Sequence, residues 1–144
     1  MMKWLWLVVV ALVVAGCSSE PTPAEKAAQD PLAVWQPDLD APIAELELLL
    51  ESQSQQQNIN RVAGQLAVLN DARLYQLYLR KLGGLEGESR QAFEKEQRDW
   101  LEERDRISRA AAEEFRGGSI SPFIASQAFI DETRARYAAL EARR

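Results

Sequence analysis

Apolar side chains recur at helical spacing beyond Pro42. A first short stripe is followed by polar residues 52–58, which predict a break or an exposed turn. A longer stripe with steps of three and four then extends to Tyr78, and a run of glycines over residues 83–87 predicts its end. The apolar positions of the two stripes are Ile43, Leu46, Leu49 and Leu50, then Ile59, Val62, Leu66, Leu69, Leu74 and Leu77. We expect the first helix to be capped by Asp40 or Ala41.

Two further helices are predicted in the second half of the chain. One begins near Ser89 and ends near Arg116. The next begins at Pro122 with Ser121 as its N-cap. Their apolar faces contain Phe93, Trp100, Ile107, Ala111 and Phe115, and then Phe123, Ile130, Tyr137 and Leu140. Because no segment alternates with period two over a sustained length, we expect an all-α fold, a small bundle of three or four helices.

The first sixteen residues differ from the rest, because fourteen of them are apolar. The run from Trp4 to Gly16 is shorter than the roughly 20 residues that a membrane-spanning helix needs. It ends in Val14-Ala15-Gly16-Cys17, which resembles the lipobox of bacterial lipoproteins. We therefore predict a lipoprotein signal peptide over residues 1–16 and an acylated Cys17 that holds the protein on a membrane. The alternative is an ordinary secretory signal followed by a cysteine by chance.

Residues 17–41 are predicted to be a lipid-anchored, proline-rich linker, and residues 42–144 the helical domain. Prolines at this density do not sustain a helix and give an extended tether. Trp35 is the exception in the linker, and it either packs on the domain or contacts a partner. Ser18 follows the cysteine. By resemblance to lipoprotein sorting in a Gram-negative host, a residue other than Asp there favours the outer membrane, facing the periplasm.

The composition excludes several classes of chemistry. The 144 residues contain no His and one Cys, and they are enough for one small domain. Without His there is no Ser-His-Asp or Cys-His pair and no common zinc site. A single Cys cannot form an intrachain disulfide. Since no phosphate-binding loop, nucleophile elbow or metal cluster is present either, we expect no enzyme activity, no metal and no cofactor.

Charge points away from nucleic acid as a partner. Asp and Glu number 22 against 17 Lys and Arg, which gives a net charge of −5, and no basic tract is present. The charges concentrate in residues 86–116, where we interpret them as a solvated helix face. The i,i+4 pairs expected on this face are Glu94–Arg98, Glu102–Arg106 and Asp105–Arg109.

Polar and aromatic side chains share one face of that charged helix. At 100° per residue, Gln97, Trp100 and Arg104 lie together, so polar groups come close to the apolar core. A partly buried guanidinium needs a carboxylate or several carbonyls, and Asp71 on the preceding helix is the candidate partner of Arg104. Thr133 and Arg134 are expected to add hydrogen bonds between the last two helices. These six residues either form a structural polar core, which we favour, or line a ligand groove.

Three stretches of the chain carry recognisable motifs. Asn60 with Asp71–Tyr78 is similar to a D-x-x-L-x-x-x-Y helix, Gln97–Asp105 to a Q-x-x-W-x-x-x-R-D signature, and Gly117–Ile120 with Thr133–Arg136 to a G-G-S turn and a T-x-x-R helix. Together, over about residues 55–140, they resemble the LprI-like family of lysozyme inhibitors from bacterial envelopes. Family members commonly carry cysteines where this chain has Ser108, Ala128 and Val62. The resemblance therefore implies a domain whose helices are held by packing without disulfides.

The resemblance gives the turn Gly117-Gly118-Ser119 two interpretations. In the first, the glycines end one helix and Ser121 begins the next. In the second, the turn binds a partner by entering the sugar cleft of a muramidase, where its N–H groups and the Ser119 hydroxyl meet the catalytic carboxylates.

Two functions follow from these observations. The first is an envelope lipoprotein that inhibits lysozyme and so protects peptidoglycan, with an acidic domain suited to a basic enzyme. The second is an accessory lipoprotein of envelope assembly or stress, which binds another envelope protein through the bundle and has no effect on lysozyme.

Overall fold

The computed structural model describes residues 36–143, and those from Pro37 onward belong to one compact unit. The predicted signal peptide, Cys17, Ser18, Trp35 and most of the predicted linker lie outside the described residues.

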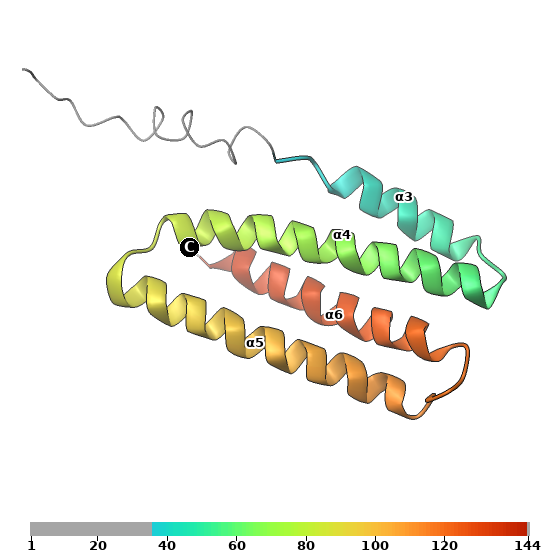
Figure 1. Ribbon diagram of the computed structural model, residues 1–144. Helices are drawn as coiled ribbons and strands as arrows, with labels where there is room; N and C mark the ends of the chain where they lie inside the picture. Colours follow the sequence, from blue (N-terminus) through green and yellow to red (C-terminus); the bar gives the residue numbers. More distant parts are fainter. Residues whose placement is uncertain (1–35, 144) are drawn as a thin grey trace, which may run out of the picture. The chain divides into compact units, whose positions relative to one another are not determined.

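Four helices make up this unit, and the described residues contain no strand. The helices are α3 (Asp40–Glu51), α4 (Gln56–Gly83), α5 (Gly87–Glu113) and α6 (Ser121–Ala142) (Figure 1). The prediction of a small all-α bundle is confirmed, and the polar stretch after α3 is indeed a break between two helices. Within residues 36–143, every helix is too short or too polar to cross a membrane.

Helix α6 is central to the packing, because it contacts both α4 and α5 along its length (Figure 1). Helices α4 and α5 make few direct contacts with each other. Helix α3 packs on α4. The space between α4 and α5 is consequently filled by side chains and by hollows rather than by close backbone approach.

Two apolar clusters hold the helices together. One joins α4, α5 and α6 and consists of Leu74, Leu77, Leu82, Phe93 and Leu140, with Trp100 and Tyr137 packed against it. The other brings Ile43 of α3 against Leu66 of α4 and Ile130 of α6. The segment from Ile43 to Leu50 therefore belongs to the domain, since Ile43 is buried and Leu50 packs on the second cluster.

The start of α3 differs from the prediction. Asp40 is the first residue of the helix rather than its cap, and Leu39 occupies the N-cap position. Asp38 accepts a hydrogen bond from the Asp40 N–H at 2.9 Å. The Asp40 carboxylate instead pairs with Arg73 of α4 at 2.8 Å. An interhelical ion pair has thus taken the side chain that the sequence suggested as a local cap.

The i,i+4 pairs predicted on α5 are wrong in register. The ion pairs within this helix are Arg90–Glu94, Lys95–Asp99, Glu103–Arg106 and Arg104–Asp105. Glu94 and Glu102 each have an arginine four residues away in both directions, and sequence spacing does not choose between the two. One result is that Arg98 has no ion-pair partner among residues 36–143.

Candidate functional site

A buried arginine on α5 connects three helices. The Arg104 side chain is only 7% exposed, and its Nη1 lies 2.6 Å from Oδ1 of Asp71 on α4. Its guanidinium lies 3.9 Å from the ring centre of Phe129 on α6 and 4.9 Å from that of Trp100. The expected contact between Arg104 and Asp71 is present, and two aromatic faces replace part of the water that the cation gives up.

A second buried arginine, Arg136 on α6, is the last residue of the T-x-x-R motif, but the polar-core role was predicted for its neighbour Arg134. Arg136 donates from Nε and Nη2 to Oε1 of Gln97 at 3.1 and 3.0 Å, and from Nη1 to Glu96 at 2.7 Å. Its guanidinium also lies 5.6 Å from the centre of the Trp100 ring. Spacing could have found it, because Arg136 is three residues after Thr133 and four before Leu140, both of which are buried.

The prediction that Thr133 and Arg134 form hydrogen bonds between the last two helices is wrong. The Thr133 hydroxyl donates to the Phe129 carbonyl one turn earlier in α6, at 2.7 Å. Arg134 donates to Asn70 of α4 at 3.2 Å and pairs with Glu47 of α3. Arg134 therefore fastens α3 and α4 to α6, because its position on α6 faces away from α5.

Arginine contacts also control the acidity of Glu96. The pKa of the Glu96 carboxyl is lowered to about 2, chiefly by the hydrogen bonds from Arg143 and also by Arg136, while partial burial opposes the shift. The carboxylate is stabilised because two guanidinium groups converge on it from the end of α6.

The turn between α5 and α6 is exposed but held in place. Gly117 has φ of +80°, which an L side chain rarely adopts. A Cβ on Gly118 would lie 3.1 Å from the Phe115 carbonyl oxygen. Asn60 at the start of α4 donates to the Ser119 carbonyl at 2.8 Å. Both glycines and the remote Asn60 therefore define one backbone path for this turn.

Ser121 differs from its predicted role as a cap. It is the first residue of α6, Ile120 occupies the N-cap position, and the Ser121 hydroxyl donates to the Ala112 carbonyl of α5 at 3.3 Å. The side chain thus closes the turn against the end of the preceding helix.

The site residues predicted from the sequence fall into two separate groups. Asp71, Gln97, Trp100 and Arg104 meet in the middle of the bundle, whereas Gly117, Gly118 and Ser119 lie exposed at one end. Within residues 36–143, no three His, Cys, Asp or Glu side chains are grouped so that they could hold a metal ion.

The described residues therefore form a small all-α bundle with an exposed turn before α6. The family model described as "Lysozyme inhibitor LprI" matches residues 50–140, and the chain belongs to this family. The matched stretch contains α4, α5, α6 and the turn before α6, while nearly all of α3 precedes it. No curated protein and no solved structure matches the chain.

Replacing Asp71 and replacing Arg104 are expected to lower the free energy of unfolding by different amounts. Asp71→Ala leaves the buried guanidinium with only the longer 3.4 Å contact to Asp105 and should lower the free energy of unfolding by about 3 kcal/mol. Arg104→Met leaves a carboxylate that is 47% exposed and can be hydrated, so we expect a loss of about 1–2 kcal/mol. Urea denaturation followed by circular dichroism measures both. Unchanged stability in both variants would contradict a structural role for the pair.

Acid should weaken the contribution of Glu96. Because its folded pKa is lowered from 4.5 to about 2, the contribution is fully present above pH 4.5 and is lost as the pH falls toward 2. The difference in unfolding free energy between the wild type and Glu96→Gln should shrink across this range. NMR titration of the Glu96 carboxyl gives the pKa directly, and a midpoint near 4.5 would refute the arginine contacts.

Proposed function

We propose that this protein is a lipid-anchored inhibitor of lysozyme in the bacterial cell envelope, where it protects peptidoglycan. The activity is inferred from the family match. The structural observation that carries the proposal is the exposed turn between α5 and α6, which a hydrogen bond from Asn60 holds in place. Inhibitors that enter an enzyme cleft benefit when the inserted segment is ordered before binding, because less entropy is then lost.

The turn has the chemistry that a carboxylate-containing cleft would meet. Its tip consists of two glycines and a serine, which allow close backbone approach. The N–H groups of Gly117 and Ser119 have no acceptor among the described residues. They can therefore donate to an enzyme's carboxylates, and the exposed Phe115 and Ile120 beside them can pack on the cleft walls.

The overall charge supports the same partner. A net charge of −5 favours encounter with a basic enzyme, and this attraction weakens with salt. Charge alone gives no orientation, so we assign recognition to the turn and encounter to the acidic surface.

Inhibition should depend on the turn rather than on charge. We expect residues 18–144 to inhibit lysis of bacterial cells by chicken-type or goose-type lysozyme in a turbidity assay, at near-stoichiometric ratio and across a salt series. Ser119→Tyr adds bulk at an exposed position without changing the backbone and should weaken inhibition at least tenfold. Ser54→Tyr, in the exposed turn between α3 and α4, is the matched control and should inhibit like the wild type.

Two results would contradict this function. Inhibition that disappears at moderate salt and is equal in both tyrosine variants would reduce the effect to charge attraction. A folded protein that inhibits neither type of enzyme would favour the accessory lipoprotein of envelope assembly or stress, and the search would move to envelope protein partners.

The anchor requires Cys17. Expressed in a Gram-negative host, the chain should incorporate radiolabelled palmitate and partition into detergent with the outer membrane. Cys17→Ser should abolish both, because the thiol is the acceptor of the lipid. Labelling that persists in Cys17→Ser, or a wild-type protein that is released without label, would refute the anchor.

A further inference from the structure

A hollow of about 370 Å³ lies between α4 and α5, where the two helices make few contacts. Asp71, Tyr75 and Tyr78 line it from α4, and Gln97 and Arg98 from α5. Asn60, which holds the turn before α6, is fifteen residues from Tyr75 on α4, or about 22 Å along the helix. The hollow is therefore a different surface from the turn assigned to lysozyme.

A buried amide faces the hollow with an unused donor. Gln97 is 8% exposed, and its Oε1 accepts two hydrogen bonds from Arg136. Because a guanidinium only donates, the oxygen must face Arg136 and the NH₂ group must face away from it. No described residue accepts a hydrogen bond from Nε2 of Gln97. Because Gln127 Oε1 is the one fully enclosed side-chain N or O atom of residues 36–143 without a partner, Nε2 of Gln97 has solvent access, and a ligand oxygen in the hollow can accept a hydrogen bond from it.

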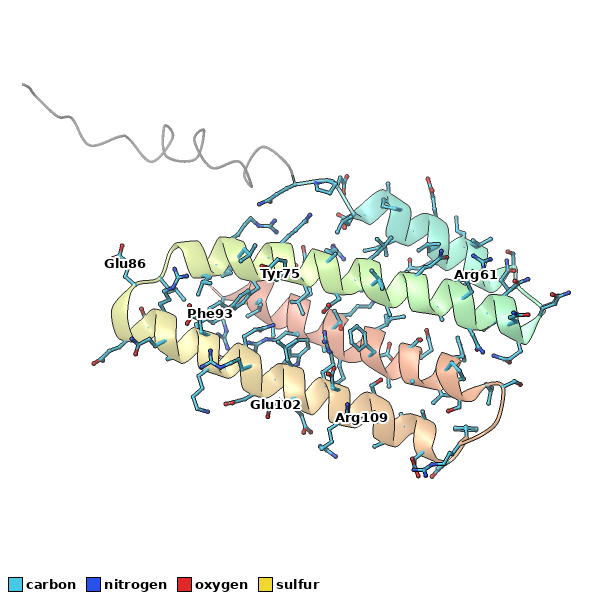
Figure 2. All side chains as sticks on the ribbon, in the orientation of Figure 1. Arg61, Tyr75, Glu86, Phe93, Glu102 and Arg109 are labelled. Atoms are coloured by element: carbon cyan, nitrogen blue, oxygen red, sulfur yellow. The ribbon has the colours of Figure 1, made fainter. Side chains whose placement is uncertain are left out.

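One wall of the hollow is formed by the ring of Tyr75, which stacks on a second aromatic ring. Tyr75 is 59% exposed, and its ring stacks on Tyr78 with centres 6.5 Å apart. Tyr78 in turn stacks on Phe93 of α5 at 5.2 Å. Figure 2 shows Tyr75 and Phe93 on neighbouring helices toward the same end of the bundle. An exposed ring held in this way offers its electron-rich face to the C–H groups of a flat, polar ligand such as a pyranose.

Of the charged side chains that line the hollow, one arginine has no ion-pair partner among the described residues. Oδ1 of Asp71 is paired with Arg104, and Glu94 is paired with Arg90. Arg98 has no carboxylate partner among residues 36–143, and its charge acts on the Tyr78 hydroxyl beside the hollow. The surplus guanidinium favours a carboxylate, while the second oxygen of Asp71 can accept from a hydroxyl group.

We propose that this hollow binds a pyranose sugar that carries a carboxylate. Tyr75 stacks on the ring, Gln97 Nε2 donates to a ring substituent, Asp71 accepts from a hydroxyl, and Arg98 pairs with the acid group. Muramic acid and uronic acids share this chemistry. The assignment stands independently of lysozyme inhibition, because it uses another surface.

The test is a titration of the ¹⁵N-labelled full chain in non-ionic detergent micelles, with the Gln97 side-chain NH₂ resonance as the reporter. The probes are N-acetylmuramic acid, glucuronic acid and N-acetylglucosamine. Both acids should shift the resonance, and the neutral sugar should bind about tenfold more weakly. The acid with the lower Kd identifies the source of the ligand.

Two variants assign the contacts, and a third is their control. Tyr75→Ala should weaken every sugar about tenfold, since the stacking face is lost. Arg98→Gln should remove the preference for acidic over neutral sugar and leave N-acetylglucosamine unchanged. Arg109→Gln changes the same charge on the same helix, at an exposed position outside the hollow (Figure 2), and should bind like the wild type. All three should keep the wild-type circular dichroism spectrum and inhibition of lysozyme.

Several outcomes would overturn the proposal. A Gln97 NH₂ resonance that no sugar shifts up to its solubility limit would show that the hollow takes no sugar. An equal response to lactate would reduce it to an anion site. A stronger response to an acidic dipeptide than to either sugar acid would assign it to peptide, and full binding by Tyr75→Ala would remove the stacking face from the site.

Discussion

Two buried guanidinium groups near one indole set the relative register of the helices in this bundle. Arg104 and Arg136 come from different helices, and both lie near the ring of Trp100. A buried cation tolerates few alternatives, because it needs its carboxylate or amide oxygen in place. The relative register of α4, α5 and α6 is therefore fixed by directional contacts, while the apolar clusters supply the burial that any similar helix packing could provide.

This constraint explains how α5 can be so polar and still belong to a bundle. Among its residues only Phe93, Gln97 and Arg104 are buried, so this helix contributes one apolar side chain to the fully buried set. Its other contacts to the bundle include the hydrogen bond from Arg136 of α6 to Gln97 and the pair of Arg104 with Asp71 of α4. At Ser108, where the family resemblance places a cysteine, the hydroxyl donates to the Ala125 carbonyl at 2.8 Å.

The sequence was sufficient for the fold and for part of the polar core. Apolar spacing and glycine runs predicted the helices, and the shared face of Gln97, Trp100 and Arg104 led to the pair with Asp71. Spacing from Thr133 and Leu140 would have placed Arg136 on a buried face, but only the packing of α6 decides that this face meets α5 while Arg134 meets α3 and α4. Arg98 was missed for a similar reason, because the choice of Glu94 between two equally spaced arginines depends on the surroundings. The contact between Asn60 and Ser119 joins residues 59 positions apart, which no local pattern reveals.

The junction at the start of α3 has a mechanical consequence. The Pro37 carbonyl accepts a hydrogen bond from Gln76 at 3.2 Å, and Asp40 pairs with Arg73, so the entering chain is fastened to α4 before α3 begins. Tension transmitted along the preceding chain would load these two polar contacts first, and then the docking of Ile43, before it reached the buried arginines. Beyond these contacts, α3 is held by its side chains in the second cluster and by the Arg134–Glu47 pair, none of which is a contact of Arg104 or Arg136, so loss of α3 would leave the partners of both buried arginines in place.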